Sequence, residues 1–471
     1  VLSTGDWYKI SVQESGIYKI GFADLQAYGI NPENIDPRTI SLHGFAGGML
    51  PEKNQDLIYD DLPQITIQVV GEEDGIFNTD DYILFYGQSP NVWKIEASKQ
   101  KMTHSTNLYN DYTYYYLTTG TQNPLRIGTQ NQTALSPSHV VTTYRKGLIH
   151  ELELQQMTKS GKKWYGETFN PETLQSFSFQ FPDIDTTAKV NAELSVAGRS
   201  SLPNWFNLLY NSDTLLTISM VGMSGDQMGK LYARSDTESV QFKVKDQNIN
   251  LKLSYNLPSS TSIGILDYLE VNAVCKLIFR QGQLPYTYMP RQSGGTIPEI
   301  FLAEAGSNVS IWNITDRLNV LRLATTFKND GQSFKLQTAS PLEFVAFDNT
   351  SFLTPVFVNK VVNQNLHALQ PADYIIIAPE EFMAEAEELA QLHQSHSGLS
   401  TLVVPLKPIY EEFSSGAQDP VGIKAFIRML YLRAEPGKEP RYVLLYGDGS
   451  YDPKNRIAGN TNVIPVFESQ E

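Results

Sequence analysis

The stretch Arg441–Asn455, R-Y-V-L-L-Y-G-D-G-S-Y-D-P-K-N, decides the fold class of the C-terminal part of the chain. Tyr442 to Tyr446 is an unbroken apolar run of five residues. A run of this kind, bounded by turn residues, is typical of a strand that is buried on both faces of a parallel sheet. We therefore predict a buried parallel strand at Tyr442–Tyr446.

Polar residues follow this strand directly. Asp448 stands between two glycines, and Asp452 and Asn455 come after it in a turn. Sites in open α/β sheets form where loops leave the carboxyl ends of the strands, so Asp448, Asp452 and Asn455 are candidates for the rim of a pocket. The alternative is that the two aspartates only stabilise the turn. A phosphate cradle is disfavoured, because no helix follows the glycines and an aspartate repels phosphate.

Upstream of this stretch, strands alternate with helices. Tyr374–Ala378 and Thr401–Val404 are short apolar runs typical of buried strands. Between them apolar residues recur at helical spacing from residue 382 to 393, and Gly398 ends that helix. Asp419-Pro420 supplies the N-cap and first residue of a second helix. The order strand, helix, strand, helix, strand predicts a parallel sheet with right-handed crossovers.

The rest of the chain is predicted to be mostly β structure in several domains. From 188 to 196, apolar and polar residues alternate with period two, and several later runs repeat this pattern. Strands without intervening helices predict a β-sandwich, in a jelly-roll-like arrangement. We divide the chain into an N-terminal β-rich domain (1–130), a β-sandwich domain (131–300), a β-rich connector (301–370) and the first part of an α/β domain (371–471). Within the first domain, Trp7–Ile10 and Gly16–Ile20 are predicted to pair as a hairpin.

Composition excludes several classes of protein. The net charge of −15 over 471 residues argues against a nucleic-acid partner. A single cysteine excludes an intramolecular disulfide and a cysteine-rich zinc site. No run of about 18 apolar residues occurs, so we expect no transmembrane segment. The chain begins Val1-Leu2-Ser3, which is expected of a mature, exported form whose signal peptide has been removed.

Three groups of residues contain side chains that can act as a nucleophile or as metal ligands. Cys275 shares the apolar face of a predicted strand and is expected in the core, not as a nucleophile. His393 and His396 lie three residues apart near a helix end, where a solvent-facing or structural role is favoured over a metal pair. An acidic loop offers weak candidates for a structural calcium ion, against the alternative of a solvated hairpin loop. These calcium candidates are Glu72, Asp74 and Asp80.

Six stretches, in this order, resemble the gingipain-type cysteine peptidases of Bacteroidota, and within them the sortase of the type nine secretion system. The stretches are Trp164–Glu167, Val309–Thr315, Asn363–His367, Asp373–Pro379, Ile409–Gly416 and Tyr442–Asn455. The resemblance implies a caspase-like, three-layer α/β subdomain at residues 371–471. It also implies a cysteine nucleophile activated by a histidine in a Gly-His-Gly segment, and no required cofactor.

This sequence contains no Gly-His-Gly segment, and Cys275 lies upstream of the loop that the dyad should follow. We therefore expect no catalytic residue in this chain, the dyad downstream of Glu471, and no activity of the fragment. The resemblance further implies secreted cargo proteins as substrates, outer-membrane secretion components as partners, and a location at the outer membrane surface or outside the cell. The rival hypothesis is a surface β-sandwich binding or adhesion protein with a non-catalytic α/β tail.

Overall fold

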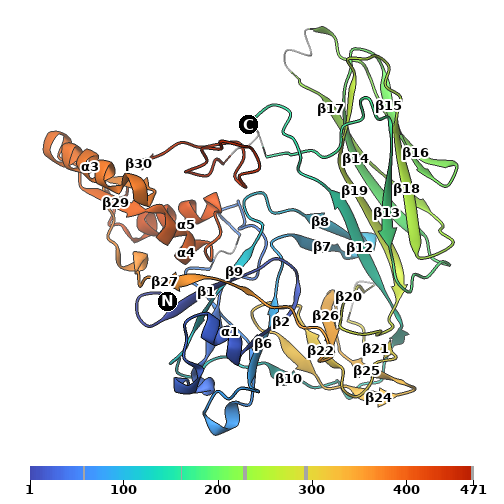
Figure 1. The fold of residues 1–471 in the computed structure, drawn as a ribbon, viewed down its shortest axis with the longest axis horizontal. Helices are drawn as coiled ribbons and strands as arrows, with labels where there is room; N and C mark the ends of the chain where they lie inside the picture. Colours follow the sequence, from blue (N-terminus) through green and yellow to red (C-terminus); the bar gives the residue numbers. More distant parts are fainter. Residues whose placement is uncertain (57–58, 161, 226–230, 291–294, 468–471) are drawn as a thin grey trace.

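The β-sandwich lies at the centre of the chain and forms one arm of the molecule (Figure 1). The computed structural model describes residues 1–56, 59–160, 162–225, 231–290 and 295–467. One sheet of the sandwich has the order β12-β19-β14-β17, and the other has the order β13-β18-β15-β16. The strands are β12 (Thr143–Glu151), β13 (Leu174–Gln180), β14 (Val190–Arg199), β15 (Asn204–Tyr210), β16 (Asp213–Met220), β17 (Arg234–Phe242), β18 (Asn248–Tyr255) and β19 (Ile263–Lys276). The period-two pattern predicted this sandwich correctly.

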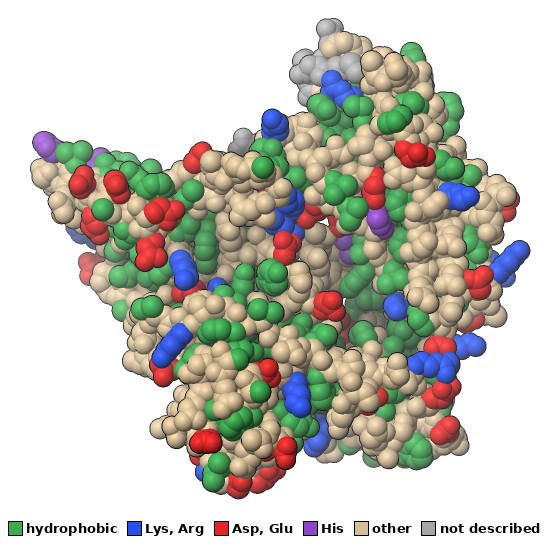
Figure 2. Space-filling view, viewed as in Figure 1, with side chains coloured by type: hydrophobic (Ala, Val, Ile, Leu, Met, Phe, Trp, Pro, Cys, Tyr) green, Lys and Arg blue, Asp and Glu red, His purple; other side chains and the backbone are tan. Residues whose placement is uncertain are grey.

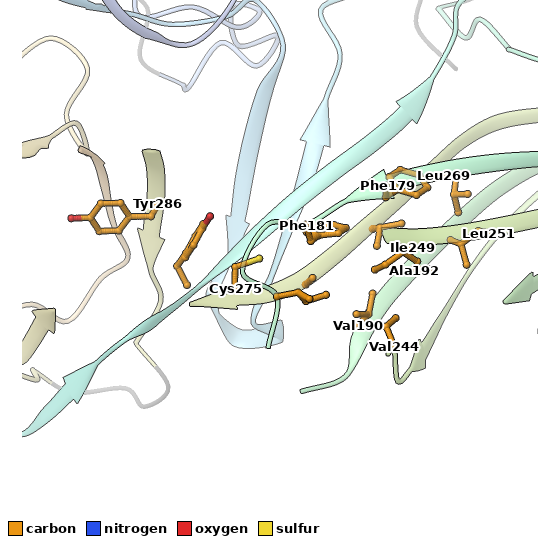
Figure 3. Packing of buried hydrophobic residues seen from close by; sticks show 14 of the residues in the cluster. Phe179, Phe181, Val190, Ala192, Val244, Ile249, Leu251, Leu269, Cys275 and Tyr286 are labelled. Carbon is orange, nitrogen blue, oxygen red and sulfur yellow. The ribbon is translucent and has the colours of Figure 1, made fainter. Parts of the chain in front are cut away.

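Cys275 belongs to the apolar core of this sandwich. Its side chain is fully buried, and Figure 3 shows it among core residues that include Phe181. Burial raises the pKa of its thiol to about 11. The prediction of a core cysteine is confirmed, because a buried thiol with a raised pKa is not a ready nucleophile.

The N-terminal domain is built from two small sheets and a hairpin. The sheets have the orders β27-β1-β9-β3-β4 and β2-β6-β5, and β7 pairs with β8. The elements are β1 (Trp7–Val12), β2 (Gly16–Gly21), α1 (Phe22–Ala27), β3 (Ser41–His43), β4 (Gln64–Ile65), β5 (Gln68–Val70), β6 (Tyr82–Gly87), β7 (Val92–Glu96), β8 (Lys101–Ser105), β9 (Thr113–Thr118) and β27 (Val356–Val361). The predicted hairpin of β1 with β2 is wrong, because β1 pairs with β9 and β27 while β2 pairs with β6.

A third group of strands lies beside the sandwich and comes from distant parts of the chain. Its sheets have the orders β10-β23-β22-β26-β20 and β11-β21-β25-β24. The strands are β10 (Gly128–Gln130), β11 (His139–Val141), β20 (Gln283–Tyr288), β21 (Pro298–Ala303), β22 (Ser310–Asn313), β23 (Leu321–Leu323), β24 (Thr326–Lys328), β25 (Gly331–Lys335) and β26 (Leu342–Phe347). Strand pairing thus crosses the boundaries that we predicted at residues 130 and 300, and β27 of the predicted connector joins the N-terminal sheet.

The C-terminal part is an α/β unit with a parallel sheet of the order β29-β28-β30. Its elements are β28 (Tyr374–Ala378), α3 (Met383–Ser397), β29 (Thr401–Pro405), α4 (Leu406–Phe413), α5 (Pro420–Arg433) and β30 (Tyr442–Leu445). The alternation of strands and helices is confirmed. Helix α4 was not predicted, although its apolar residues Leu406, Ile409, Tyr410 and Phe413 recur at helical spacing. Within the described ranges, no helix is both long and apolar enough to cross a membrane.

One feature of this sheet differs from the prediction. β30 was expected to be buried on both faces, but Tyr442, Val443 and Leu445 are 53%, 43% and 42% exposed. The reason is its place in the sheet: β30 pairs with β28 and, among the described residues, with no further strand. An apolar run in the sequence does not distinguish a strand that is covered by neighbours from a strand at an open edge of the sheet.

Candidate functional site

The open edge of β30 borders an apolar groove of about 870 Å³. One wall is α5, with Ile423, Ile427 and Tyr431, and the floor is formed by Val443 and Leu445 of β30. The other wall comes from the end of the described chain, residues 464–467. The groove therefore runs along α5 and β30 and reaches the loop at the carboxyl end of the parallel sheet, where α/β proteins place their sites.

The turn between α4 and α5 fixes this α/β unit to the N-terminal domain. The Ser415 hydroxyl donates to the backbone carbonyl of Tyr114 at 3.0 Å and accepts from the backbone N–H of Phe45 at 3.2 Å. Asp419, the N-cap of α5, accepts from the N–H of Val421 in its own helix and from the N–H of Leu50, each at 2.9 Å. Both ends of the turn are therefore bound to the loop between β3 and β4, and Ser415 is also bound to β9.

Lys9 is the buried cation of this contact. It is only 7% exposed, its Nζ donates to the carbonyl of Gly416 at 3.1 Å, and it lies 4.1 Å from the ring centre of Tyr114. Burial lowers the pKa of Lys9 to about 8, against the opposing charge of Glu411 on α4. Burial in turn raises the pKa of Glu411, against the attraction of Lys9. The interface thus contains two charged groups that stabilise each other inside the protein.

The loop after β30 holds the three predicted pocket-rim residues in different environments. Asp448 is exposed, and it stands between Gly447 and Gly449, which line the groove. Asn455 is also exposed, and its side-chain oxygen accepts from Asn460 at 2.5 Å. Of the three candidates, Asp448 is thus the one placed at the groove, and its role as a rim residue stays a prediction.

Asp452, in contrast, is completely buried within the loop. Its carboxylate accepts from Arg456 Nη1 at 3.0 Å and from the N–H of Ile457 at 2.8 Å. Its backbone carbonyl accepts from Asn460 at 2.7 Å. Through these bonds Asp452 holds the loop in its conformation. This placement fits the alternative role for Asp452, the stabilisation of the turn.

The same loop is attached to the β-sandwich by ion pairs. Lys454 Nζ and Arg456 Nη2 both donate to Oε2 of Glu153, at 3.1 and 2.5 Å. The Arg456 guanidinium lies 4.3 Å from the ring centre of Trp164. Tyr451 stacks on the same indole, with ring centres 6.0 Å apart and an angle of 21° between the ring planes. Figure 1 shows the C-terminal segment leaving β30 and extending toward the sandwich. The molecular surface is hollowed between these two parts (Figure 2).

A histidine attaches the β7–β8 hairpin to the sandwich nearby. His104 Nδ1 lies 3.0 Å from Glu270, and Nε2 lies 3.0 Å from Glu151. Both ring nitrogens face carboxylate oxygens, and both can donate only in the charged imidazolium form. Burial by itself lowers the pKa of His104, but the hydrogen bonds and charges of Glu151 and Glu270 raise it to about 9. The pKa of Glu151 is held below its usual value by His104, against the effect of burial.

The remaining candidates have local partners. Glu72 pairs with Arg126 at 2.8 Å, and Asp74 accepts from Ile76 N–H and from the Asn78 side chain, each at 3.0 Å. Among the residues that the structure describes, no group of three or more His, Cys, Asp or Glu side chains is arranged to hold a metal ion. Calcium at Glu72, Asp74 and Asp80 therefore stays a prediction without a preformed ligand set.

The histidine pair was predicted to be structural or solvent-facing, and the placement of its members agrees. His393 packs edge-on against Tyr374, with ring centres 4.9 Å apart. His396 is exposed near the end of α3.

Sequence reasoning missed the residues that position this site. Lys9, Glu153 and Arg456 were not singled out, because each acts on a partner more than 300 residues away. A weak signal exists: Glu151 and Glu153 alternate at the end of a strand, and Lys454 and Arg456 alternate in the loop. Complementary charges at the same period-two spacing suit two extended segments that face each other.

Residues 367–471, at the C-terminal end of the chain, match the model of peptidase family C25. The resemblance to gingipain-type cysteine peptidases is thus confirmed for the α/β unit. Over 99% of its length the chain also has the fold of dimeric latent PorU from Porphyromonas gingivalis, with a TM-score of 0.85 and 22% identity. The chain spans 44% of the length of that PorU chain.

Two other similarities are too weak to carry an argument. A CBM36-1 domain of a multidomain xylanase, from the hindgut metagenome of Trinervitermes trinervoides, covers 27% of this chain and 96% of its own, at 16% identity and a TM-score of 0.18. The insecticidal delta-endotoxin Cry8Ea1 from Bacillus thuringiensis covers 50% of this chain and 41% of its own, at 14% identity and a TM-score of 0.18. No curated protein matches the chain by sequence.

Removing the Asp452 carboxylate is predicted to loosen the loop. Asp452→Ala removes one of the two acceptors of the partly buried Arg456 guanidinium and leaves the N–H of Ile457 without its acceptor, at a local cost of about 1 to 3 kcal/mol. We expect faster cleavage by trypsin after Lys454 and Arg456 at low protease concentration. Asp448→Ala, which alters an exposed carboxylate in the same loop, is the control and should cleave at close to the parent rate. Equal rates for the parent and Asp452→Ala would contradict the assigned role.

The charge of His104 is predicted to make stability depend on pH above neutrality. Its pKa is raised on folding from 6.5 to about 9, so its contribution is fully present below about pH 6.5 and is lost as pH rises through 9. A shift of this size corresponds to about 3 kcal/mol. Urea unfolding from pH 6 to 10 should show that wild type is more stable than His104→Gln at pH 6. This difference in the free energy of unfolding should disappear as the pH rises through 9. The difference between the two proteins is the measurement, because Lys9 titrates in the same range. A constant difference would contradict the ion-pair account.

Proposed function

We propose that this protein is the part of a gingipain-like cysteine endopeptidase that carries the β-rich scaffold and the first half of the peptidase domain. The observation that carries the proposal is the match of residues 367–471 to peptidase family C25, on a parallel sheet whose β30 edge is open and apolar. The nucleophile and its base then belong to a further part of the enzyme, which packs on the open edge of β30. This packing would pair the free edge of β30, and the groove along α5 would stay open beside it.

The chain's own cysteine does not fit the role of nucleophile. Cys275 is the single cysteine of the sequence, and it lies in the core of the sandwich instead of beside the groove. The raised pKa of its buried thiol keeps it in the unreactive protonated form at neutral pH. A cysteine peptidase needs a thiolate next to a base, so residues 1–471 alone should not cleave peptides.

The finer role follows the similarity in fold to PorU. We propose a sortase-like processing of secreted cargo proteins in a type nine secretion system of Bacteroidota, at the outer membrane surface or outside the cell. Outer-membrane secretion components are the proposed partners. The reaction requires no cofactor in this proposal, and any calcium would be structural. The net charge of −15 is compatible with an exported protein that does not bind nucleic acid.

Peptidase assays test the proposal directly. Residues 1–471 should show no thiol-dependent cleavage of a peptide library, whereas a protein that adds the remainder of the family C25 domain should cleave and be blocked by iodoacetamide. Cys275→Ala in that complete protein is the matched control and should keep full activity. Cleavage by residues 1–471, or loss of activity in Cys275→Ala with the fold intact, would contradict the proposal. An inactive complete protein would favour the surface binding or adhesion alternative.

A further inference from the structure

Two glutamates at the end of β12 face the same side of the chain and serve two different contacts. Glu151 is the last residue of β12, and Glu153 follows it by two positions, so an extended backbone directs both side chains the same way. Leu152 and Leu154, which alternate with them, are 40% and 63% exposed. Both glutamates line a cavity of about 250 Å³, together with His104 of the β7–β8 hairpin and Lys454 of the loop after β30. Three parts of the protein therefore meet at one short segment.

Within this junction, Glu153 is the residue that joins the loop to the sandwich. Lys454 is 4% exposed, Arg456 16% and Glu153 18%, so these ion pairs are shielded from water. Each cation has a second acceptor: Asp111 for Lys454, and Asp452 for Arg456, both at 3.0 Å. The bond of Arg456 to Asp452 lies within the loop. Loss of the Glu153 charge would thus remove the ion pairs to the sandwich while leaving that internal bond and the stacking on Trp164 in place.

The position of the loop matters because its two ends line the groove. Gly447 and Gly449 open the loop, Ile464 and Phe467 close the described chain, and all four border the groove beside β30. The middle of the loop, at Lys454 and Arg456, is held by Glu153. A shift of the middle relative to the sandwich would therefore move the walls of the groove.

We propose that Glu153 is a positioning residue of the peptidase site: through Lys454 and Arg456 it fixes the loop 447–467 against the β-sandwich and so sets the shape of the groove beside β30. The β-sandwich is then a structural part of the site as well as a neighbouring domain. This inference rests on the proposed function for its catalytic meaning, whereas the mechanical link stands on the contacts alone. Trp164 strengthens the link by stacking with Tyr451 and contacting Arg456.

The mechanical link is tested with residues 1–471. Glu153→Gln keeps the size of the side chain and removes its charge, and Glu153→Asp keeps the charge on a shorter side chain. Glu172→Gln, at an exposed glutamate of the same domain, is the matched control. Hydrogen exchange followed by mass spectrometry should show amides of 447–467 exchanging about tenfold faster in Glu153→Gln, less in Glu153→Asp, and unchanged in Glu172→Gln. Exchange across the strands β14 and β19 should stay unchanged.

The catalytic meaning is tested in the complete protein. Glu153→Gln should raise KM for a peptide substrate several-fold with kcat within about twofold, since groove walls act on binding more than on the chemical step. Unchanged loop exchange in Glu153→Gln would overturn the link, and equal losses of kcat and thermal stability without a change in KM would overturn the positioning role. If the complete protein has no peptidase activity at all, the proposed function fails, while the exchange experiment still decides whether Glu153 holds the loop.

Discussion

The contact between the α4–α5 turn and the N-terminal sheet is the constraint on which the arrangement of this protein depends. Lys9 enters that contact from β1, and Ser415 and Asp419 bind backbone groups of the loops around it. A lysine that is 7% exposed is costly to bury, and it stays charged only because a carbonyl, two aromatic rings and Glu411 surround it. Such a contact tolerates little displacement, since moving the turn would leave a buried ammonium group without its acceptor. The α/β unit is thereby fixed relative to the β domains.

A second contact, made by the loop after β30, limits the remaining freedom of the α/β unit. The loop after β30 reaches the sandwich at Glu153, and the sandwich reaches the N-terminal hairpin at His104. The β domains and the α/β unit therefore form a closed ring of contacts in which each polar junction is partly buried. A three-stranded parallel sheet with an open apolar edge would be poorly defined in isolation, and this ring holds the edge and its groove in place. The same logic explains why residues far from the groove influence its walls.

The elements that depend on local pattern could be predicted from the sequence. The period-two run at 188–196 indicated a sandwich strand, and Asp419-Pro420 marked the start of α5 correctly. Predictions that depend on pairing failed where the partner is distant: β1 was paired with β2 on the strength of a turn, but its partners are β9 and β27. The apolar run of β30 did not reveal that the strand is at an edge. Glu153 and Arg456 are 303 positions apart in the sequence, and the residues around either one do not identify the other as its partner. Sequence therefore gave Asp448 and Asp452 as candidates but not the residues that hold their loop.

The most direct test of the central claim is to map the reactive thiol of the natural protein. A peptide-based electrophile that labels cysteine peptidases would be added to the folded protein, and the modified residue identified by mass spectrometry after digestion. The account predicts that the label is on a cysteine outside residues 1–471, and that Cys275 reacts only after unfolding in urea. Labelling of Cys275 in the folded protein at a rate comparable to a free thiol, or no labelling of any other cysteine, would contradict the account.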